Sequence, residues 1–180
     1  PFEYTLFDLG PRLKANNQIF SRALTSLKYQ GDEWDLSLNA LKSSSQQREY
    51  VDNFVNRFEY EKALATGSYR FDGRQNSAEV LEKLRLQTRR PGRYDLTSLN
   101  LTASSVLAEL PYGPLGFAAG ADIRREKMAA GTSPQVLSGT ELRPAINLVY
   151  GERKLLAGFA EFSLPLYQDL TASVAGRADR

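Results

Sequence analysis

Hydrophobic and polar side chains alternate with a period of two in six separate stretches of this chain. The clearest is Leu115–Ile123, where every odd position is apolar and the even positions run from Gly116 to the charged Asp122 and Arg124. Because successive side chains of a strand point to opposite faces, this period predicts strands with one apolar face. The six predicted strands span about 18–29, 33–40, 98–107, 115–123, 154–164 and 169–179. The predicted fold class is therefore all-β.

The connections between these stretches alternate strictly between short and long. Short turns at about 30–32, 111–114 and 165–168 join the strands in pairs, and long links at about 43–92 and 128–147 separate the pairs. This order predicts an antiparallel up-and-down sheet with both long links at one end. Tyr50, Phe54 and Phe58 recur near helical spacing, and Asn76 or Ser77 offers a helix cap. We therefore expect one or two short helices in the first link, which Pro91 and Gly92 should close.

Composition excludes several classes of function. The chain of 180 residues has a net charge of only +2, which argues against a nucleic-acid-binding protein. It has no Cys and no His, so thiol and imidazole chemistry is absent. We predict no catalytic, cofactor-binding or metal-binding residues and no enzyme activity. No run of about 18 apolar residues predicts a transmembrane helix. The chain opens on PFEYTLFDLG without Met or a signal peptide, so we expect a processed chain or an internal piece.

Aromatic pairs flank all three short turns and favour a membrane location. The pairs are Tyr29 with Trp34, Tyr112 with Phe117, and Phe162 with Tyr167. Rings of this kind gather at the headgroup level of transmembrane barrels. The apolar face should therefore meet lipid and the polar face a lumen, with room for close approach at Gly116, Ala118 and Gly120. The predicted lipid-facing residues are Leu99, Leu101, Leu115, Phe117, Ile123, Leu170 and Val174. The predicted lumen-facing residues are Glu33, Asp35, Asn39, Asp122 and Arg177.

A basic cluster lies at the end of the first long link. It consists of Arg85, Arg89, Arg90 and Arg93. Such a cluster is either a solvated face or a patch that captures an anionic ligand at the mouth of the lumen.

At these residues the chain resembles the β-barrel of TonB-dependent outer-membrane receptors. The likeness is carried by LTSLNLTASSVLAELPYGPLGFAAGADIRREKM and by LAGFAEFSLPLYQDLTASVAGRAD, and less specifically by SRALTSLKYQGDEWDLSLNA. The resemblance implies a barrel of about 22 strands in the bacterial outer membrane, with a plug domain and a TonB energy-coupling protein as partners. It also implies uptake of a scarce small-molecule nutrient, of the siderophore-iron, vitamin or oligosaccharide class. No ligand contacts carry over from the family.

Three departures indicate an internal segment of such a receptor. No plug or coupling motif is recognisable, six strands are too few to close the barrel, and the chain ends on Arg180 instead of an aromatic residue. We therefore interpret residues 1–180 as a partial barrel domain. Two alternatives remain open. One is a complete small structural outer-membrane barrel. The other is a soluble ligand-binding barrel, in which the apolar face would turn inward.

Overall fold

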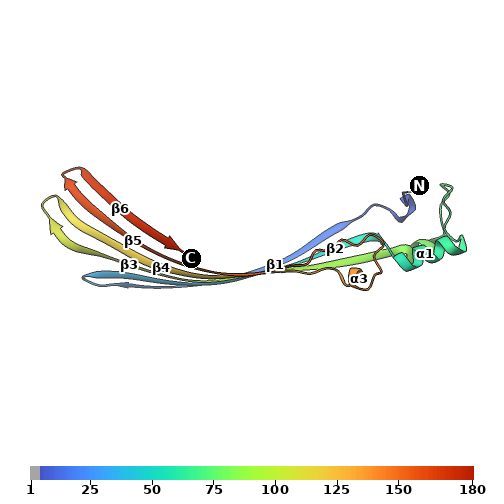
Figure 1. Ribbon diagram of the computed structural model, residues 1–180, viewed down its shortest axis with the longest axis horizontal. Helices are drawn as coiled ribbons and strands as arrows, with labels where there is room; N and C mark the ends of the chain where they lie inside the picture. The colour runs from blue at the N-terminus through green and yellow to red at the C-terminus, as the bar shows by residue number, and fades with distance from the viewer. Residues whose placement is uncertain (1–4) are drawn as a thin grey trace. The chain divides into compact units, whose positions relative to one another are not determined.

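The computed structural model describes residues 5–180 and contains one sheet of six antiparallel strands (Figure 1). The order in the sheet follows the chain: β1 (Lys14–Gln30), β2 (Trp34–Val55), β3 (Arg85–Leu110), β4 (Gly113–Ala130), β5 (Val149–Tyr167) and β6 (Leu170–Asp179). The predicted all-β class and all six strands are confirmed. Within the described residues β1 and β6 are the two edges of the sheet, which is open and not closed into a barrel.

The strands are longer than the sequence pattern predicts, so the long links are shorter. β2 continues to Val55 and β3 begins at Arg85, which leaves 56–84 and 131–148 between strands. The predicted bounds of 43–92 are therefore too wide, whereas those of 128–147 differ from the observed link by three residues at the start and one at the end. Tyr50 and Phe54 both lie in β2, so their spacing of four residues did not indicate a helix. Pro91 and Gly92 lie inside β3, where the Pro91 carbonyl accepts a hydrogen bond from the Gly131 N–H at 2.9 Å.

One residue in β2 shifts the alternation of faces. Asn53 adopts a positive φ of 61°, a conformation that Asn tolerates better than most residues. Its side-chain amide donates to the Pro11 carbonyl at 2.7 Å. Val51 and Phe54 are consequently both buried although they are three residues apart.

Two short helices occupy the first link, as predicted, and the second link contains a single helical turn that was not predicted. Helix α1 (Arg57–Thr66) begins where the Asn56 side chain accepts hydrogen bonds from the Phe58 and Glu59 N–H groups, and it ends at Gly67 with a φ of 65°. Ser77, not Asn76, caps α2 (Ala78–Leu84). Two single turns complete the set: η1 (Phe7–Leu9), and α3 (Pro134–Leu137), which Ser133 caps.

The chain divides into two compact units. We call the first the loop unit; it comprises residues 5–19, 46–93 and 129–150. We call the second the turn unit; it comprises residues 20–45, 94–128 and 151–180. All three short turns fall in the turn unit and both long links fall in the loop unit. This division matches the predicted alternation of short and long connections.

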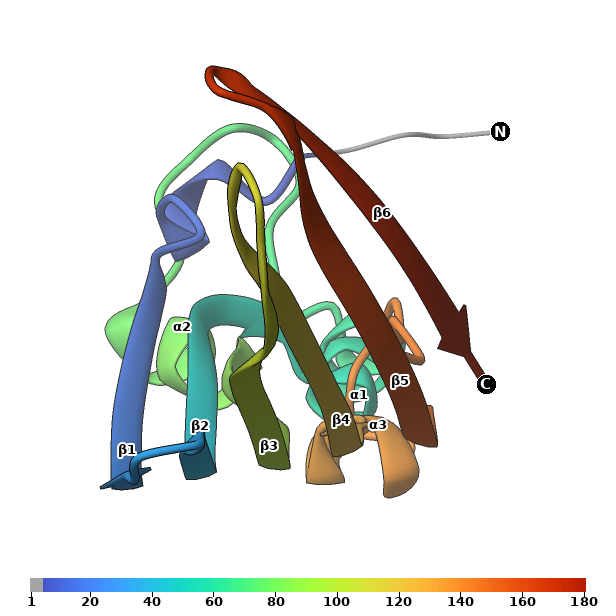
Figure 2. The same cartoon turned by 90° about the vertical axis from the view of Figure 1, so that its left-hand side faces the viewer.

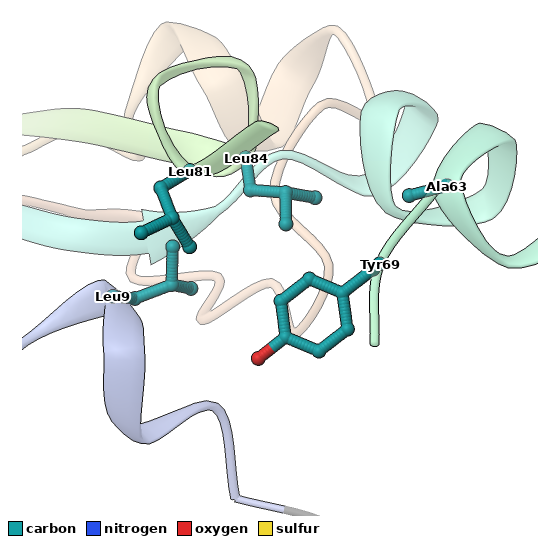
Figure 3. Packing of buried hydrophobic residues seen from close by; sticks show 5 residues of the cluster. All are labelled: Leu9, Ala63, Tyr69, Leu81 and Leu84. Carbon is teal, nitrogen blue, oxygen red and sulfur yellow. The ribbon is translucent and has the colours of Figure 1, made fainter. Parts of the chain in front are cut away.

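The loop unit has a small hydrophobic core where the helices meet the start of the described chain (Figure 3). It is made by Leu9, Ala63, Tyr69, Leu81 and Leu84. Beside it, Asp8 accepts hydrogen bonds from the Tyr69 hydroxyl at 2.5 Å and the Asn76 amide at 2.6 Å. Burial raises the pKa of the Asp8 carboxyl, but these two hydrogen bonds outweigh it and leave the pKa below its usual value.

Candidate functional site

The turn unit has one polar and one apolar face, and the register of the β5–β6 hairpin fixes which side chains share them. Figure 2 shows β5 and β6 side by side. Phe159 lies opposite Arg177, and Phe162 lies opposite Val174, in an antiparallel register. Directly opposed residues share a face, and neighbours in sequence alternate. We call the side of Asp122, Glu126, Phe159, Glu161, Ser163 and Arg177 the polar face. We call the side of Trp34, Phe117, Phe162 and Val174 the apolar face.

Charged side chains form a connected network on the polar face. The Arg153 Nε donates to Glu126 Oε2 at 2.6 Å. Arg124 lies between Asp122 and Glu126, at 3.9 Å from each carboxylate. Glu126 is only 9% exposed, so its pairing with Arg153 offsets much of the cost of removing its charge from water. This network keeps opposite charges paired across β4 and β5.

The five predicted lumen-facing residues fall into three groups. Asp122 lies near enough to Arg177 to interact electrostatically, and Arg177 makes a bidentate contact with Asp179 at 2.8–3.0 Å. Asn39 accepts a hydrogen bond from Ser26 at 2.7 Å and donates one to Ser37 at 3.2 Å. The remaining two, Glu33 and Asp35, line a separate hollow. The structure therefore does not gather the five into one site.

That hollow is open and has a volume of about 510 Å³. Glu33, Asp35 and Glu161 supply its carboxylates, and Gly116 and Ala118 supply small surfaces. The predicted room for close approach is therefore present at Gly116. It is not present at Gly120, because the Phe159 ring covers that glycine: a Cβ there would lie 2.4 Å from Phe159 Cε1. Gly120 thus serves the packing of an aromatic ring.

Apolar side chains on the other face are exposed. Leu99, Leu101 and Ile123 are 45–54% exposed, and Val174 is 63% exposed. Rings from different hairpins meet on this unit: Phe117 lies 4.9 Å from Phe162 and 6.2 Å from Trp34, and Tyr112 lies 5.1 Å from Tyr167. The aromatic pairs predicted at the separate turns therefore form contacts between hairpins. The remaining predicted lipid-facing residues are Leu115, which is half-buried, and Leu170, which is exposed.

The four predicted arginines do not form one patch. All four lie in β3, not in a link, and Arg90 points into the loop unit. It contacts Glu49 at 3.5 Å and the buried Glu141 at 3.4 Å. Arg85, Arg89 and Arg93 are exposed and alternate with Arg90 along the strand, and Arg85 pairs with Glu82 at 2.9 Å. Alternation in a strand splits a sequence cluster of this kind between two faces.

Arg90 holds three segments of the loop unit together. Glu49 on β2 bridges it to Lys14 on β1, which lies 2.6 Å from the carboxylate. Glu141 in the second link also accepts from Ser133 at 3.4 Å. Arg90 and Arg12 lie over the Phe54 ring, at 5.5 and 4.4 Å from its centroid. Arg90 is therefore a structural residue that ties the second link to the strands.

A different set of arginines lines a hollow in the loop unit. Arg48 joins Arg89 and Arg93 there, beside Pro91, Gly92 and Gly131. Arg48 is not among the predicted site residues, because the sequence pattern around it predicts a link. If the predicted strand had continued past residue 43, the alternation of faces would have placed Arg48 with the other even-numbered residues of β2.

Comparison with protein-family models and with curated proteins finds no match for this chain. No helix in residues 5–180 has the length and apolar character needed to cross a membrane. The described residues contain no group of three or more Asp or Glu side chains arranged to hold a metal ion.

Proposed function

We propose that the chain is a segment of the transmembrane wall of an outer-membrane receptor of the TonB-dependent class, which imports a scarce nutrient. One observation carries the proposal: the turn unit presents exposed leucines, isoleucine and valine on one face, with the paired Arg125, Lys127 and Glu152 beyond Ile123, and a paired charge network on the other face. In water, such a surface would be an aggregation hazard. Against lipid it is the expected surface of a barrel wall, with the polar face toward a lumen.

The open edges of the sheet support a role as part of a larger barrel. Backbone N–H and C=O groups without a partner in hydrocarbon cost several kcal/mol each, so β1 and β6 require further strands. In the proposal these come from the rest of a barrel of about 22 strands in the parent chain, and the parent chain also supplies the plug domain and the contact with the energy-coupling protein. The nutrient is a siderophore, a vitamin or an oligosaccharide.

The aromatic contacts support the orientation. Trp34, Phe117, Phe162 and the Tyr112–Tyr167 pair all lie near short turns, as an interfacial girdle would. Barrels of this kind keep short turns on the periplasmic side. The links at 56–84 and 131–148 then lie outside the cell.

Protease accessibility in intact cells tests this placement. A cleavage site introduced beside Gly73, in the exposed part of the first link, should be cut without opening the outer membrane. The matched control is the same site beside Tyr112, in the β3–β4 turn, which should be cut only after the membrane is opened. The reverse pattern would contradict the proposed orientation, and cleavage of both sites in a soluble fraction would contradict the membrane location.

A complete small barrel is the second candidate, favoured only by the modest length of the chain. It requires β1 and β6 to close on each other, or on strands of another copy. A heat-resistant monomeric barrel formed in lipid by residues 1–180 alone would establish this alternative and overturn the wall-segment proposal.

A further inference from the structure

Another hollow in the loop unit has the composition of a ligand pocket. It has a volume of about 380 Å³, within the range of roughly 300–1,000 Å³ that small-molecule sites occupy. The start of the described chain contributes Leu6 and Arg12 to its lining, α1 contributes Tyr60, and the second link contributes Leu142 and Arg143. No Asp or Glu is among its lining residues. We call it the Arg12–Arg143 pocket.

Both arginines of this pocket lack an internal countercharge. Within residues 5–180, neither Arg12 nor Arg143 forms an ion pair or a side-chain hydrogen bond, whereas Arg90 in the same unit contacts two glutamates. Two like charges around one pocket repel each other, and a bound anion removes that repulsion. A guanidinium presents paired N–H donors that match the two oxygens of a carboxylate. The pocket therefore favours an anion with a planar acid group.

Aromatic and aliphatic side chains lie beside these two charges. The Arg12 guanidinium lies over the Phe54 ring, 4.4 Å from its centroid, which restricts where its charge can sit. Tyr60 is half-buried and lines the pocket together with Leu6 and Leu142. A flat ring can stack on a guanidinium or on another ring, which an aliphatic chain cannot do. An aromatic body is therefore the apolar part of a ligand that this lining fits best.

Hydrogen bonds fix two walls of the pocket against the end of β2. The Leu142 N–H donates to the Val55 carbonyl at 3.1 Å, which holds the second link there. The Asn53 amide donates to the Pro11 carbonyl at 2.7 Å, which holds the start of the described chain against the same strand. The segments that carry the two arginines are thus anchored before any ligand binds. A preformed site loses less conformational entropy on binding than one that must be assembled.

We infer that the Arg12–Arg143 pocket binds a small aromatic carboxylate. The two arginines hold the carboxylate, and the aromatic body lies beside Tyr60 and the leucines of the pocket. The inference goes beyond the proposed function and rests on the loop unit alone, since neither the pocket nor its ligand class depends on a membrane location.

Binding of cinnamate by the whole chain in dodecyl maltoside micelles, measured by calorimetry against protein-free micelles, tests this inference. The unmodified chain should bind cinnamate, and Arg12→Gln/Arg143→Gln should bind it about tenfold more weakly or worse, because charge-assisted hydrogen bonds are lost. The matched control, Arg48→Gln/Arg89→Gln, removes the same charge from two exposed arginines of the loop unit that lie outside this pocket, and it should leave the affinity unchanged. Equal affinity of the pocket variant and the unmodified chain would overturn the inference.

Two analogues of cinnamate test the two parts of the ligand class. Cinnamamide keeps the ring and removes the charge, so it should bind about tenfold more weakly or worse. Cyclohexylacrylate keeps the carboxylate and replaces the aromatic ring by a saturated one, so it should also bind more weakly than cinnamate. Equal binding of cinnamamide would overturn the carboxylate assignment, and equal or tighter binding of cyclohexylacrylate would overturn the aromatic assignment.

Two further measurements keep the test decisive if Arg12→Gln/Arg143→Gln fails to fold. Saturation-transfer NMR should show magnetisation passing from the unmodified chain to the cinnamate ring protons, and its absence would overturn the site without any variant. Arg12→Lys/Arg143→Lys keeps both charges but not the paired donors, so its affinity should fall between those of the unmodified chain and the Gln variant. An unchanged affinity in the Lys variant would contradict the pairing of guanidinium with carboxylate.

Discussion

The two units of this chain bury their apolar residues in different ways. The loop unit encloses Leu9, Tyr69, Leu81 and Leu84, each 6% exposed or less, and adds the buried Val51, Phe54 and Ala63. In the turn unit Ala157 is the one hydrophobic residue among those described that is fully buried, and large side chains such as Leu101 and Val174 are exposed. The loop unit therefore has a hydrophobic core of its own. The turn unit leaves most of its apolar side chains exposed, which is the surface that the proposed membrane location requires.

Charged side chains also have different roles in the two units. In the turn unit Asp122 and Glu126 of the polar face are paired with arginines of β4 and β5, as in Arg153 with Glu126. In the loop unit Arg90 contacts the buried Glu141 of the second link, and Arg48, Arg89 and Arg93 line an open hollow. Charged side chains of the turn unit thus pair with one another across neighbouring strands, while Arg90 in the loop unit holds a link to the strands.

The largest expected effect is on the core of the loop unit. Leu84→Ala removes a side chain that is 1% exposed, and such substitutions cost about 2–5 kcal/mol. Leu64→Ala, at a position 48% exposed on α1, should cost much less. Hydrogen exchange of the α1 and α2 amides measures both. Equal protection of these amides in the two variants would contradict a hydrophobic core around Leu84.

A charge on the apolar face of the turn unit should have the next largest effect. Leu101→Lys places an ammonium on the proposed lipid-facing side, at an expected cost of about 2–4 kcal/mol if the position lies near the membrane midplane. Thr102→Lys, on the neighbouring residue and the opposite face, should cost little. The free energy of unfolding in lipid vesicles measures the difference. A larger cost for Thr102→Lys would reverse the assignment of the faces.

The cap of α1 should contribute a smaller amount. Asn56→Ala removes the acceptor for the Phe58 and Glu59 N–H groups and should destabilise the helix by about 1 kcal/mol. Asn56→Ser supplies another good cap and should restore most of the loss. An Asn56→Ala variant as stable as the unmodified chain would mean that packing, not capping, sets the start of α1.

The smallest expected effect is the pH dependence of the loop unit. The pKa of Asp8 is lowered in the folded state, so its contribution is fully present above the unfolded pKa of about 3.9 and is lost as the pH falls through the folded value. Amide exchange around Tyr69 should therefore accelerate below about pH 4. Asp8→Asn should abolish that acid dependence. An acid transition that persists unchanged in Asp8→Asn would assign it to another carboxyl.

Much of the fold follows from local pattern, and the exceptions have physical causes. Six strands and two link helices follow from periodicity and caps, because each depends on neighbouring residues. The end of β2 and the start of β3 do not follow from local pattern. Aromatic residues four apart occur in strands as well as in helices, and Pro91 lies inside β3 although proline usually ends a strand. The shift at Asn53 depends on its contact with Pro11, forty-two residues away.

The candidate sites were less predictable than the fold. The faces of Asp122 and Arg177 follow from alternation alone. The division of Arg90 from Arg89 and Arg93 also follows from alternation, but only once the segment is known to be a strand. Two features depend on how neighbouring strands are paired, which the sequence alone does not reveal. Phe159 covers Gly120, and Arg48 lines the same hollow as Arg89 and Arg93.

The central claim is that the apolar face of the turn unit meets hydrocarbon and its polar face does not. Spin labels at the adjacent positions Ile123 and Asp122, and at Val174 and Arg177, test it directly in lipid vesicles. Relaxation by oxygen, which concentrates in the bilayer, should be stronger at Ile123 and Val174, and relaxation by a water-soluble nickel chelate stronger at Asp122 and Arg177. Equal accessibility of both faces to the two reagents, or the reverse order, would contradict the account.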